Sequence, residues 1–279
     1  MTTRKFQIYK GDNKNGELVN FETEVKEGMV VLDVIHKIQA EQSNDLAIRW
    51  NCKAGKCGSC SMEINGKPKL SCMTRMNEYR KDETIIITPM KTFPVIKDLV
   101  TDVSWNYNQN KRIKPVKLAP EYKTEKGYVM YQKDIDRVQE FRKCIECYLC
   151  QNVCHVLRDH DKKDKFVGPR FMIRVASLEM HPLDINDRIP ELKKEFGSGM
   201  CNITKCCTDV CPENINITDN GIIPLKERVV DRFYDPLTIL RRKIFGKKKK
   251  KFPPFTSNGG NSWKTVSYTH LTLPTILLV

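Results

Sequence analysis

The chain of 279 residues contains no apolar run long enough to cross a membrane. Its longest candidate, Leu271–Val279, falls well short of the roughly 18 residues that a spanning helix needs. The first residues also lack a secretion signal, because Arg4 and Lys5 are followed by the alternating segment Phe6–Tyr9 and not by an apolar stretch or a twin-arginine pattern. We therefore expect a cytoplasmic protein whose contact with any membrane is peripheral.

Aromatic residues make up only 8% of the chain, and no group of them accompanies the basic residues. The formal net charge of +14 would suit a nucleic acid, but five of these charges form the block Lys247–Lys251. Binding of single-stranded nucleic acid usually combines basic side chains with aromatic surfaces on which bases stack. We expect no nucleic-acid partner, and instead attraction to an anionic membrane surface or an acidic protein.

The 12 cysteines are not spread along the chain as they are in small disulfide-bonded domains. They fall into three short groups, Cys52–Cys72, Cys144–Cys154 and Cys201–Cys211. Close groups of thiols in a reducing compartment are typical of metal centres.

The first group has the ligand spacing of plant-type [2Fe–2S] ferredoxins, with gaps of four and two residues and a distant fourth cysteine. Its members are Cys52, Cys57, Cys60 and Cys72. Gly55 and Gly58 let the loop bend tightly and turn its amides toward sulfur. Zinc is the alternative, but zinc sites favour paired C-x2-C units over a C-x4-C-x2-C loop. Brown colour and acid-labile sulfide would exclude zinc.

The second group has the C-x2-C-x2-C-x3-C run of bacterial ferredoxins: Cys144, Cys147, Cys150 and Cys154. In two-cluster ferredoxins the fourth cysteine of each run binds the cluster of the other run, so a second run is expected. It follows at Cys201, Thr204, Cys207 and Cys211. Threonine therefore stands where the second cysteine of this run belongs.

Exchange of the fourth cysteines divides the ligands of the second half into two sets. Cys144, Cys147, Cys150 and Cys211 are predicted to bind a [4Fe–4S] cluster, and Cys154, Cys201 and Cys207 a second cluster. Because a neutral hydroxyl holds iron poorly, Thr204 predicts that the second cluster is [3Fe–4S]. Cys206 is left over, and we expect a buried apolar side chain beside the cluster. Ligation by Cys206 is the alternative and would give a second [4Fe–4S] cluster.

The order of predicted elements indicates an α+β protein with two domains. Residues 1–103 show a hairpin, a helix over residues 31–38, a second hairpin around Asn65–Gly66 and a closing strand, which is the order of a β-grasp ferredoxin domain. Val95, Leu99 and Val103 have helical spacing, whereas residues 105–127 are polar and interrupted by prolines. Residues 104–245 are predicted to be a mainly α, bacterial two-cluster ferredoxin-like domain, with helices over residues 134–142, 169–180, 189–196 and 224–233.

Residues 246–279 fit neither domain. They begin with a basic linker, and charge disappears after Lys264. The segment Val266–Thr275 can be encoded by the adaptor DNA of transposase-based sequencing libraries. We expect a non-native tail here.

Five motifs together resemble the iron–sulfur subunit of the succinate dehydrogenase and fumarate reductase family, across nearly all of residues 1–240. They are Trp50–Cys60, Phe93–Leu99, Cys144–Cys150, Gly168–Arg170 and Cys207–Pro212. The segments Lys205–Cys207 and Pro224–Arg232 look closer to the actinobacterial branch of this family.

The resemblance implies a subunit of an oxidoreductase with no catalytic residue of its own. Electrons would pass from the covalent FAD of a flavoprotein partner through [2Fe–2S], [4Fe–4S] and [3Fe–4S] clusters to a quinone held near one or more membrane-anchor subunits. The chain would lie peripherally on the cytoplasmic face of the cell membrane. The complex would serve the tricarboxylic acid cycle or fumarate reduction.

One departure concerns the quinone site. The best-known relatives follow the cysteine at position 154 with proline and then tryptophans, whereas this chain has His155–Asp159. We therefore expect other quinone contacts beside the last cluster, namely His155, Asn202 and Thr204. The alternative function is electron delivery in a thiol-linked fumarate reductase or heterodisulfide reductase-type complex.

Overall fold

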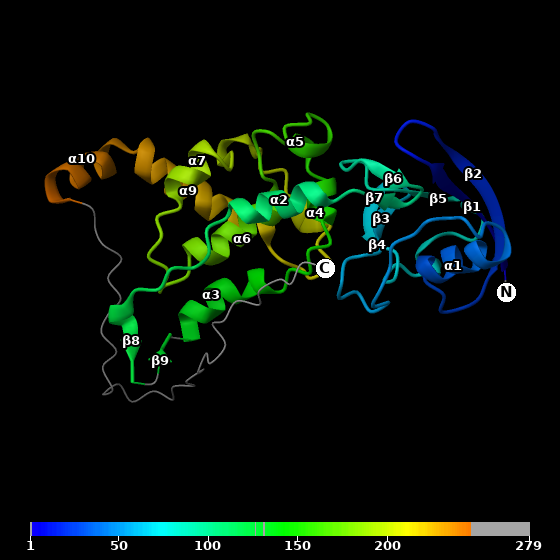
Figure 1. Cartoon of the computed structure of the whole chain (residues 1–279), viewed down its shortest axis with the longest axis horizontal. Coiled ribbons are helices and arrows are strands. Elements are labelled where there is room, and N and C mark those ends of the chain that lie inside the picture. The colour runs from blue at the N-terminus through cyan, green and yellow to red at the C-terminus, as the bar shows by residue number, and fades with distance from the viewer. Residues whose placement is uncertain (1, 126, 131, 247–279) are drawn as a thin grey trace.

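The computed structural model describes residues 2–125, 127–130 and 132–246. A β-rich N-terminal lobe (residues 2–103) and a helical C-terminal lobe (residues 104–246) lie next to each other along the long axis (Figure 1). This confirms the predicted α+β class, whereas a domain boundary at residue 103 stays a prediction. The predicted non-native tail lies outside the described residues.

The N-terminal lobe is a mixed five-stranded sheet in the order β2-β1-β5-β3-β4, with β1 and β5 parallel. Its strands and helix are β1 Thr2–Gly11, β2 Gly16–Val25, α1 Val31–Glu41, β3 Ser61–Ile64, β4 Lys67–Leu70 and β5 Ile85–Thr88. Helix α1 packs on the sheet through a core that includes Val34, Ile35 and Ile38. The turn between β3 and β4 is left-handed at Asn65 and Gly66, as the sequence predicts for a tight hairpin.

The predicted helix through residues 95–103 is wrong. The segment forms a small hairpin of β6 (Val95–Lys97) and β7 (Val100–Thr101). Asp98 causes the turn, because it has a φ of 49° and its buried carboxylate accepts the amides of Gly11 at 2.8 Å and Ala47 at 2.7 Å. Asp98 therefore links the hairpin to Gly11 and Ala47, which are distant in the sequence. These contacts determine the local structure, although the apolar residues have helical spacing.

The C-terminal lobe is mainly helical, with one short hairpin. Its elements are α2 Ser104–Arg112, β8 Lys123–Thr124, β9 Gly127–Tyr128, α3 Gln132–Arg142, α4 Leu149–Asn152, α5 His155–Arg158, α6 Pro169–Glu179, α7 Ile189–Lys194, α8 Cys206–Asp209, α9 Ile223–Phe233 and α10 Pro236–Phe245. Short 3-10 turns lie at Met76–Glu78, Pro120–Tyr122 and Ser198–Met200, and a π-helical turn, η4, at Ile217–Ile222. The central helix is α6, which buries most of its side chains.

Helix α2 falls in a segment whose polar composition predicts no helix. It buries polar side chains, since Asn106 is fully buried and Gln109 nearly so. Asn106 accepts a hydrogen bond from the buried Gln151 at 3.3 Å. A helix that packs through buried amide side chains does not show the periodic spacing of apolar residues by which helices are recognised in a sequence.

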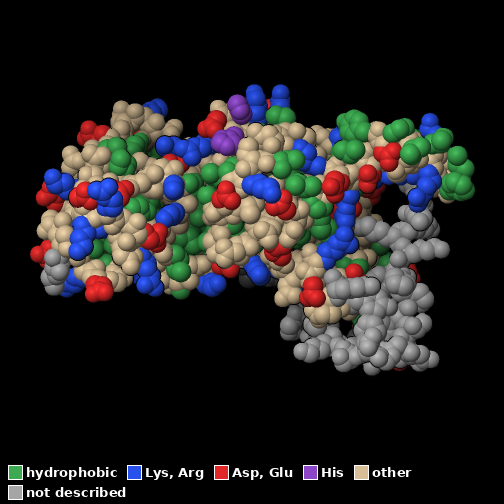
Figure 2. Space-filling view, turned by 180° about the vertical axis from the view of Figure 1, so that it is seen from behind, with side chains coloured by type: hydrophobic (Ala, Val, Ile, Leu, Met, Phe, Trp, Pro, Cys, Tyr) green, Lys and Arg blue, Asp and Glu red, His purple; other side chains and the backbone are tan. Residues whose placement is uncertain are grey.

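The last helix, α10, leaves apolar side chains exposed. Leu237, Leu240, Ile244 and Phe245 are 77%, 55%, 63% and 80% exposed. Hydrophobic side chains gather at the same end of the molecule in the reverse view (Figure 2). In the described residues, no helix is long and apolar enough to cross a membrane.

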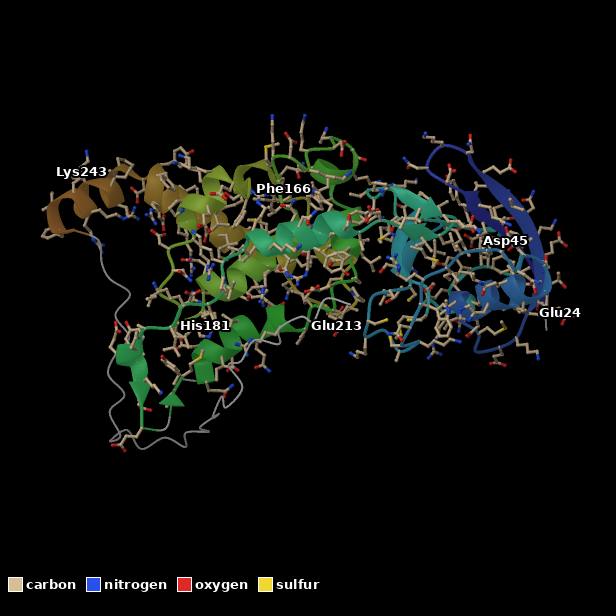
Figure 3. All side chains as sticks on the ribbon, in the orientation of Figure 1. Glu24, Asp45, Phe166, His181, Glu213 and Lys243 are labelled. Atoms are coloured by element: carbon tan, nitrogen blue, oxygen red, sulfur yellow. The ribbon has the colours of Figure 1, made fainter. Side chains whose placement is uncertain are left out.

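The two lobes meet through a buried polar contact. Asn152 at the end of α4 donates to Glu63 of β3 at 2.9 Å and accepts the amide of Thr92 at 3.1 Å. Glu63 is fully buried and also lies 3.4 Å from Lys91 and 3.6 Å from Arg158. A second bridge joins the lobes at the edge, where Glu213 (labelled in Figure 3) pairs with Lys56 at 3.3 Å.

Candidate metal centres

The first cysteine group forms a loop between α1 and β3, closed by Cys72 after β4. The amides of Ala54 and Lys56 point at the sulfur of Cys52, at 3.4 and 3.3 Å. Left-handed conformations at Lys53, Gly55 and Gly58 give the loop its tight curvature. The loop thus aims backbone amides at sulfur, as an iron–sulfur cluster requires.

The four thiols of this loop interact with one another. Burial opposes ionisation of Cys57, but hydrogen bonds from Ser59 and Cys52 outweigh it and lower the pKa of Cys57 to about 6. Burial, a hydrogen bond with Cys60 and the charges of Cys60 and Cys52 raise the pKa of Cys72 to about 12. These interactions connect Cys57 with Cys52, and Cys72 with both Cys60 and Cys52, as expected of thiols that share one cluster.

A second set of cysteines lines a small cavity in the C-terminal lobe. These are Cys144, Cys147, Cys150 and Cys211, the four that the sequence assigns to a [4Fe–4S] cluster. Burial raises the pKa of Cys147 to about 12 and that of Cys150 well above its usual value. The donor set fits a cluster, because thiolates buried this deeply need iron beside them.

Arg170 adds a positive charge to the wall of this cavity. It is 5% exposed, forms a close ion pair with Glu146, and has no partner for its Nε. Burial raises the pKa of the Cys144 thiol, and the charge of Arg170 opposes that rise. The sequence contains Arg170 in a family motif but gives no sign of this role.

The third set lines another small cavity of this lobe. Its cysteines are Cys154, Cys201, Cys206 and Cys207. Burial raises the pKa of Cys207 to about 12 and that of Cys154 to about 11, and the charges of Cys206 and Cys201 add to both shifts. Thr218 of η4 lies 3.4 Å from the sulfur of Cys207, a contact that the sequence does not predict.

Cys206 is not the buried apolar side chain that we expected. It is partly exposed, and its sulfur lies 3.2 Å from Oγ1 of Thr204 and 3.5 Å from the carbonyl oxygen of Val153. Thr204 itself lines the same cavity. The left-handed conformation of Lys205 turns the chain so that both side chains reach this cavity.

The candidate quinone contacts also meet at the third cavity, since His155 and Asn202 line it together with Thr204. His155 begins α5, and its Nδ1 lies 2.9 Å from Oδ2 of Asp159 on an exposed face. The hydrogen bond from His155 lowers the pKa of Asp159. The structure therefore brings all three candidates beside the last cysteine set.

The first and second cysteine sets touch each other. A β carbon at Gly58 would lie 2.6 Å from Cα of Cys147, so only glycine allows this approach. Cys60, Cys72 and Cys147 belong to one buried cluster of side chains. The second and third sets are joined by α4, which lies between Cys147 and Cys154.

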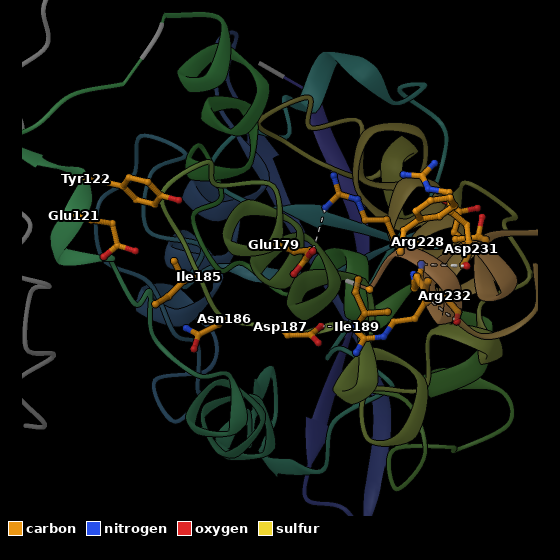
Figure 4. A pocket seen from close by; sticks show the side chains of 15 residues that line it. Glu121, Tyr122, Glu179, Ile185, Asn186, Asp187, Ile189, Arg228, Asp231 and Arg232 are labelled. Carbon is orange, nitrogen blue, oxygen red and sulfur yellow. Dashed lines mark hydrogen bonds and ion pairs between the residues drawn. The ribbon is translucent and has the colours of Figure 1, made fainter. Parts of the chain in front are cut away.

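No three His, Cys, Asp or Glu side chains of the described residues are close enough together to hold a single metal ion. A separate groove is lined by basic and acidic side chains of α6, α9 and α10, together with Glu121 and Asp187 (Figure 4). In it Arg228 pairs with Glu179 at 3.5 Å, and Arg232 pairs with Asp187. The groove has no cysteine in its wall.

Two domain families match the chain. Residues 5–108 match a 2Fe-2S iron–sulfur cluster binding domain, and residues 140–215 match a 4Fe-4S dicluster domain. These matches favour iron–sulfur clusters over the zinc alternative.

Relatives with known names agree with these domains. A chain of the Mycobacterium smegmatis Sdh1 complex in the apo form is 58% identical with a TM-score of 0.82, over 85% of this chain and 99% of that one. The succinate dehydrogenase iron-sulfur subunit of Bacillus subtilis is 31% identical over 65% of this chain and 71% of its own length. An uncharacterized iron-sulfur protein of Methanococcus maripaludis is 33% identical over 76% of this chain, which spans 42% of that protein's length. The chain belongs to the family of succinate dehydrogenase iron–sulfur subunits and is similar to its actinobacterial branch.

Proposed function

We propose that this chain conducts electrons in a succinate:quinone oxidoreductase, between the FAD of a flavoprotein subunit and a quinone. The observation that carries the proposal is the contiguity of three cysteine sets in one chain. Gly58 brings the first set against Cys147 of the second, and α4 connects the second to the third. Closely spaced redox centres are what a chain needs for electron transfer without a substrate site of its own.

We assign the ligands by cysteine set. Cys52, Cys57, Cys60 and Cys72 would hold [2Fe–2S]; Cys144, Cys147, Cys150 and Cys211 would hold [4Fe–4S]; Cys154, Cys201 and Cys207 would hold [3Fe–4S]. When bound, the clusters supply one-electron carriers whose potentials differ with cluster type, charge and hydrogen bonding. Amides of the first loop and the hydroxyl of Thr218 lie at sulfur and contribute to these differences.

The quinone end of the path belongs at the third cavity. His155, Asn202 and Thr204 line it and provide hydrogen-bonding side chains. Quinone reduction consumes protons, and the His155–Asp159 pair on the exposed side of the cavity suits their delivery. A membrane-anchor subunit would cover this face, with the chain lying peripherally on the cytoplasmic side.

A second candidate is electron delivery in a thiol-linked fumarate reductase or heterodisulfide reductase-type complex. Similarity to the Methanococcus maripaludis iron-sulfur protein favours keeping it, because the matching residues span only 42% of that longer protein. The partners that copurify with the native chain distinguish the two.

The complex purified from membranes tests the function. Added succinate should reduce the clusters, as followed by EPR spectroscopy, and the copurifying proteins should include a flavoprotein and a membrane anchor. If dithionite reduces the clusters but succinate does not, the proposal is contradicted.

Substitution of His155 tests the quinone contact. The variant His155→Ala should keep its cluster signals and its reduction by succinate, but should reduce quinone roughly 10-fold or more slowly, a typical loss for a proton-transferring group. His160→Ala is a matched control, since His160 is exposed in the same region and does not line the cavity. Equal rates in the two variants would remove His155 from the quinone site.

A further inference from the structure

The third cavity contains one more cysteine than the proposed three-iron cluster uses. Cys154, Cys201 and Cys207 account for the ligands, and Cys206 lines the same cavity. Its sulfur lies 3.5 Å from the carbonyl oxygen of Val153, the residue before Cys154. The fourth thiol is therefore part of the cluster site, although nothing in the ferredoxin pattern assigns it a role.

The position of Cys206 matches the position of the missing ligand. Thr204 stands where the run has its second cysteine, and the sulfur of Cys206 lies 3.2 Å from Oγ1 of Thr204. Lys205, with a φ of 63°, turns the chain between them. A small movement of the Cys206 side chain would bring a thiolate to the place that the threonine hydroxyl occupies.

The thiol is also accessible to an incoming ion. Cys207 is buried, whereas Cys206 is only partly buried and Thr204 is exposed. In the chain taken by itself, a ferrous ion from solvent can therefore reach Cys206 without opening the core. Thiolate sulfur is the ligand type that iron–sulfur clusters use, in contrast to a neutral hydroxyl.

We infer that Cys206 is a facultative fourth iron ligand, which lets the site bind one additional Fe²⁺ and change between three-iron and four-iron forms. This inference rests on the proposed [3Fe–4S] assignment. In the step, the Cys206 thiol loses its proton to solvent and forms a bond to Fe²⁺. The neutral, reduced [3Fe–4S] core plus Fe²⁺ has the charge and electron count of [4Fe–4S]²⁺, so no further electron is needed.

The reverse step needs a one-electron oxidant, and the oxidised quinone that we propose at this cavity is such an acceptor. Loss of one electron from the four-iron form balances as [3Fe–4S]⁺ plus released Fe²⁺, and Cys206 takes back a proton. Because cluster type affects the reduction potential, occupation by the additional iron would alter electron transfer at this end of the chain. The site would then respond to the supply of ferrous iron.

Iron uptake by the purified complex tests the inference. The oxidised complex is first examined for the EPR signal of [3Fe–4S]⁺, then reduced anaerobically with dithionite, incubated with ⁵⁷Fe²⁺ and passed through a desalting column. Mössbauer spectroscopy should find about one ⁵⁷Fe per complex in a four-iron cluster, with loss of the three-iron signal after mild reoxidation. Ferricyanide should restore that signal and release the label.

Three variants provide the comparison. Cys206→Ala and Cys206→Ser should retain the three-iron signal and take up no ⁵⁷Fe, the serine variant keeping the size of the side chain. Thr204→Cys combined with Cys206→Ala restores the regular run and should hold four irons permanently. Normal EPR signals from the other two clusters show that a variant is folded.

The outcomes separate this inference from the proposed function. A wild-type complex with the three-iron signal but no uptake, or with uptake equal to that of Cys206→Ala, overturns the inference and leaves the proposed function intact. A wild-type complex with no three-iron signal contradicts the proposed cluster assignment. If that signal then appears in Cys206→Ala, Cys206 is a permanent ligand and not a facultative one.

Discussion

Arg170 sets the charge around the second cysteine cavity. Its guanidinium is almost completely buried, pairs with Glu146 and acts on the Cys144 thiol. A positive charge favours the reduced form of a nearby cluster, because reduction adds a negative charge. Replacing Arg170 by glutamine should therefore lower the midpoint potential of the proposed [4Fe–4S] cluster. We expect a shift on the order of tens of millivolts, where about 59 mV corresponds to a tenfold change; an EPR-monitored redox titration measures it.

Arg174 is the matched control for this substitution. It lies one turn further along α6, is half-buried and is not part of the cavity wall. Arg174→Gln should shift the potential less than Arg170→Gln does, and Arg170→Lys should recover part of the loss. A potential that is unchanged or raised in Arg170→Gln would contradict the assigned role.

At the scale of elements, Asn152 is the side chain that joins α4 to the N-terminal lobe. It is fully buried and connects to Glu63 and to the amide of Thr92. Asn152→Ala would leave the buried Glu63 with fewer partners, which costs about 1–3 kcal/mol for a buried polar group. The variant complex should lose that amount of unfolding free energy in a urea titration followed by cluster absorbance.

Asn20→Ala is the control for this measurement, because it removes an exposed hydrogen bond in place of a buried one. Asn20 accepts one exposed hydrogen bond from Gln7 at 3.0 Å, so its loss should change the unfolding free energy by less than about 0.5 kcal/mol. Equal effects of the two substitutions would show that Asn152 does not hold the lobes together.

The elements also show what a sequence can predict. The β-grasp strands and the helices near residues 169–180 and 224–233 follow from alternation and helical periodicity, because each has one face in an apolar core. The structure of residues 95–103 and 104–112 does not follow from such patterns. Asp98 determines a turn by accepting hydrogen bonds from the distant amides of Gly11 and Ala47, and α2 packs through the buried amide side chain of Asn106. In both places, polar contacts between remote segments decide the local structure.

The same distinction applies to the candidate site. Cysteine spacing predicts which thiols approach one another, and the two cavities contain those sets, although ligation itself stays a proposal. The spacing predicts neither Arg170 nor Thr218, because both come from helices that approach the cysteines only in the folded chain. The exposure of Cys206 likewise depends on the turn at Lys205.

At the scale of the whole molecule, α10 lies at the far end of the C-terminal lobe from the N-terminal lobe (Figure 1), and none of its residues lines the third cavity. The N-terminal lobe contacts the second cysteine set at Gly58, so electrons entering there would move away from that lobe. Helices α5 and α10 both lie along the upper edge in Figure 1. A membrane along this edge would let α10 contact lipid while the proposed anchor subunit covers the side of α5.

The apolar side of α10 is suited to such a surface. Leu237, Leu240 and Ile244 share one side of the helix, while Arg241 and Arg242 carry positive charge. Exposed apolar side chains of this kind mark contact sites, and neighbouring basic residues favour anionic lipid. Combined replacement of Leu240 and Ile244 by glutamate should reduce the fraction of assembled complex that stays on salt-washed membranes several-fold. The EPR signals of the clusters should not change.

Leu18→Glu is the control, at an exposed apolar residue of β2 in the other lobe, and it should leave membrane retention unaltered. If α10 instead faces solvent in the complex, both variants will behave like the wild type.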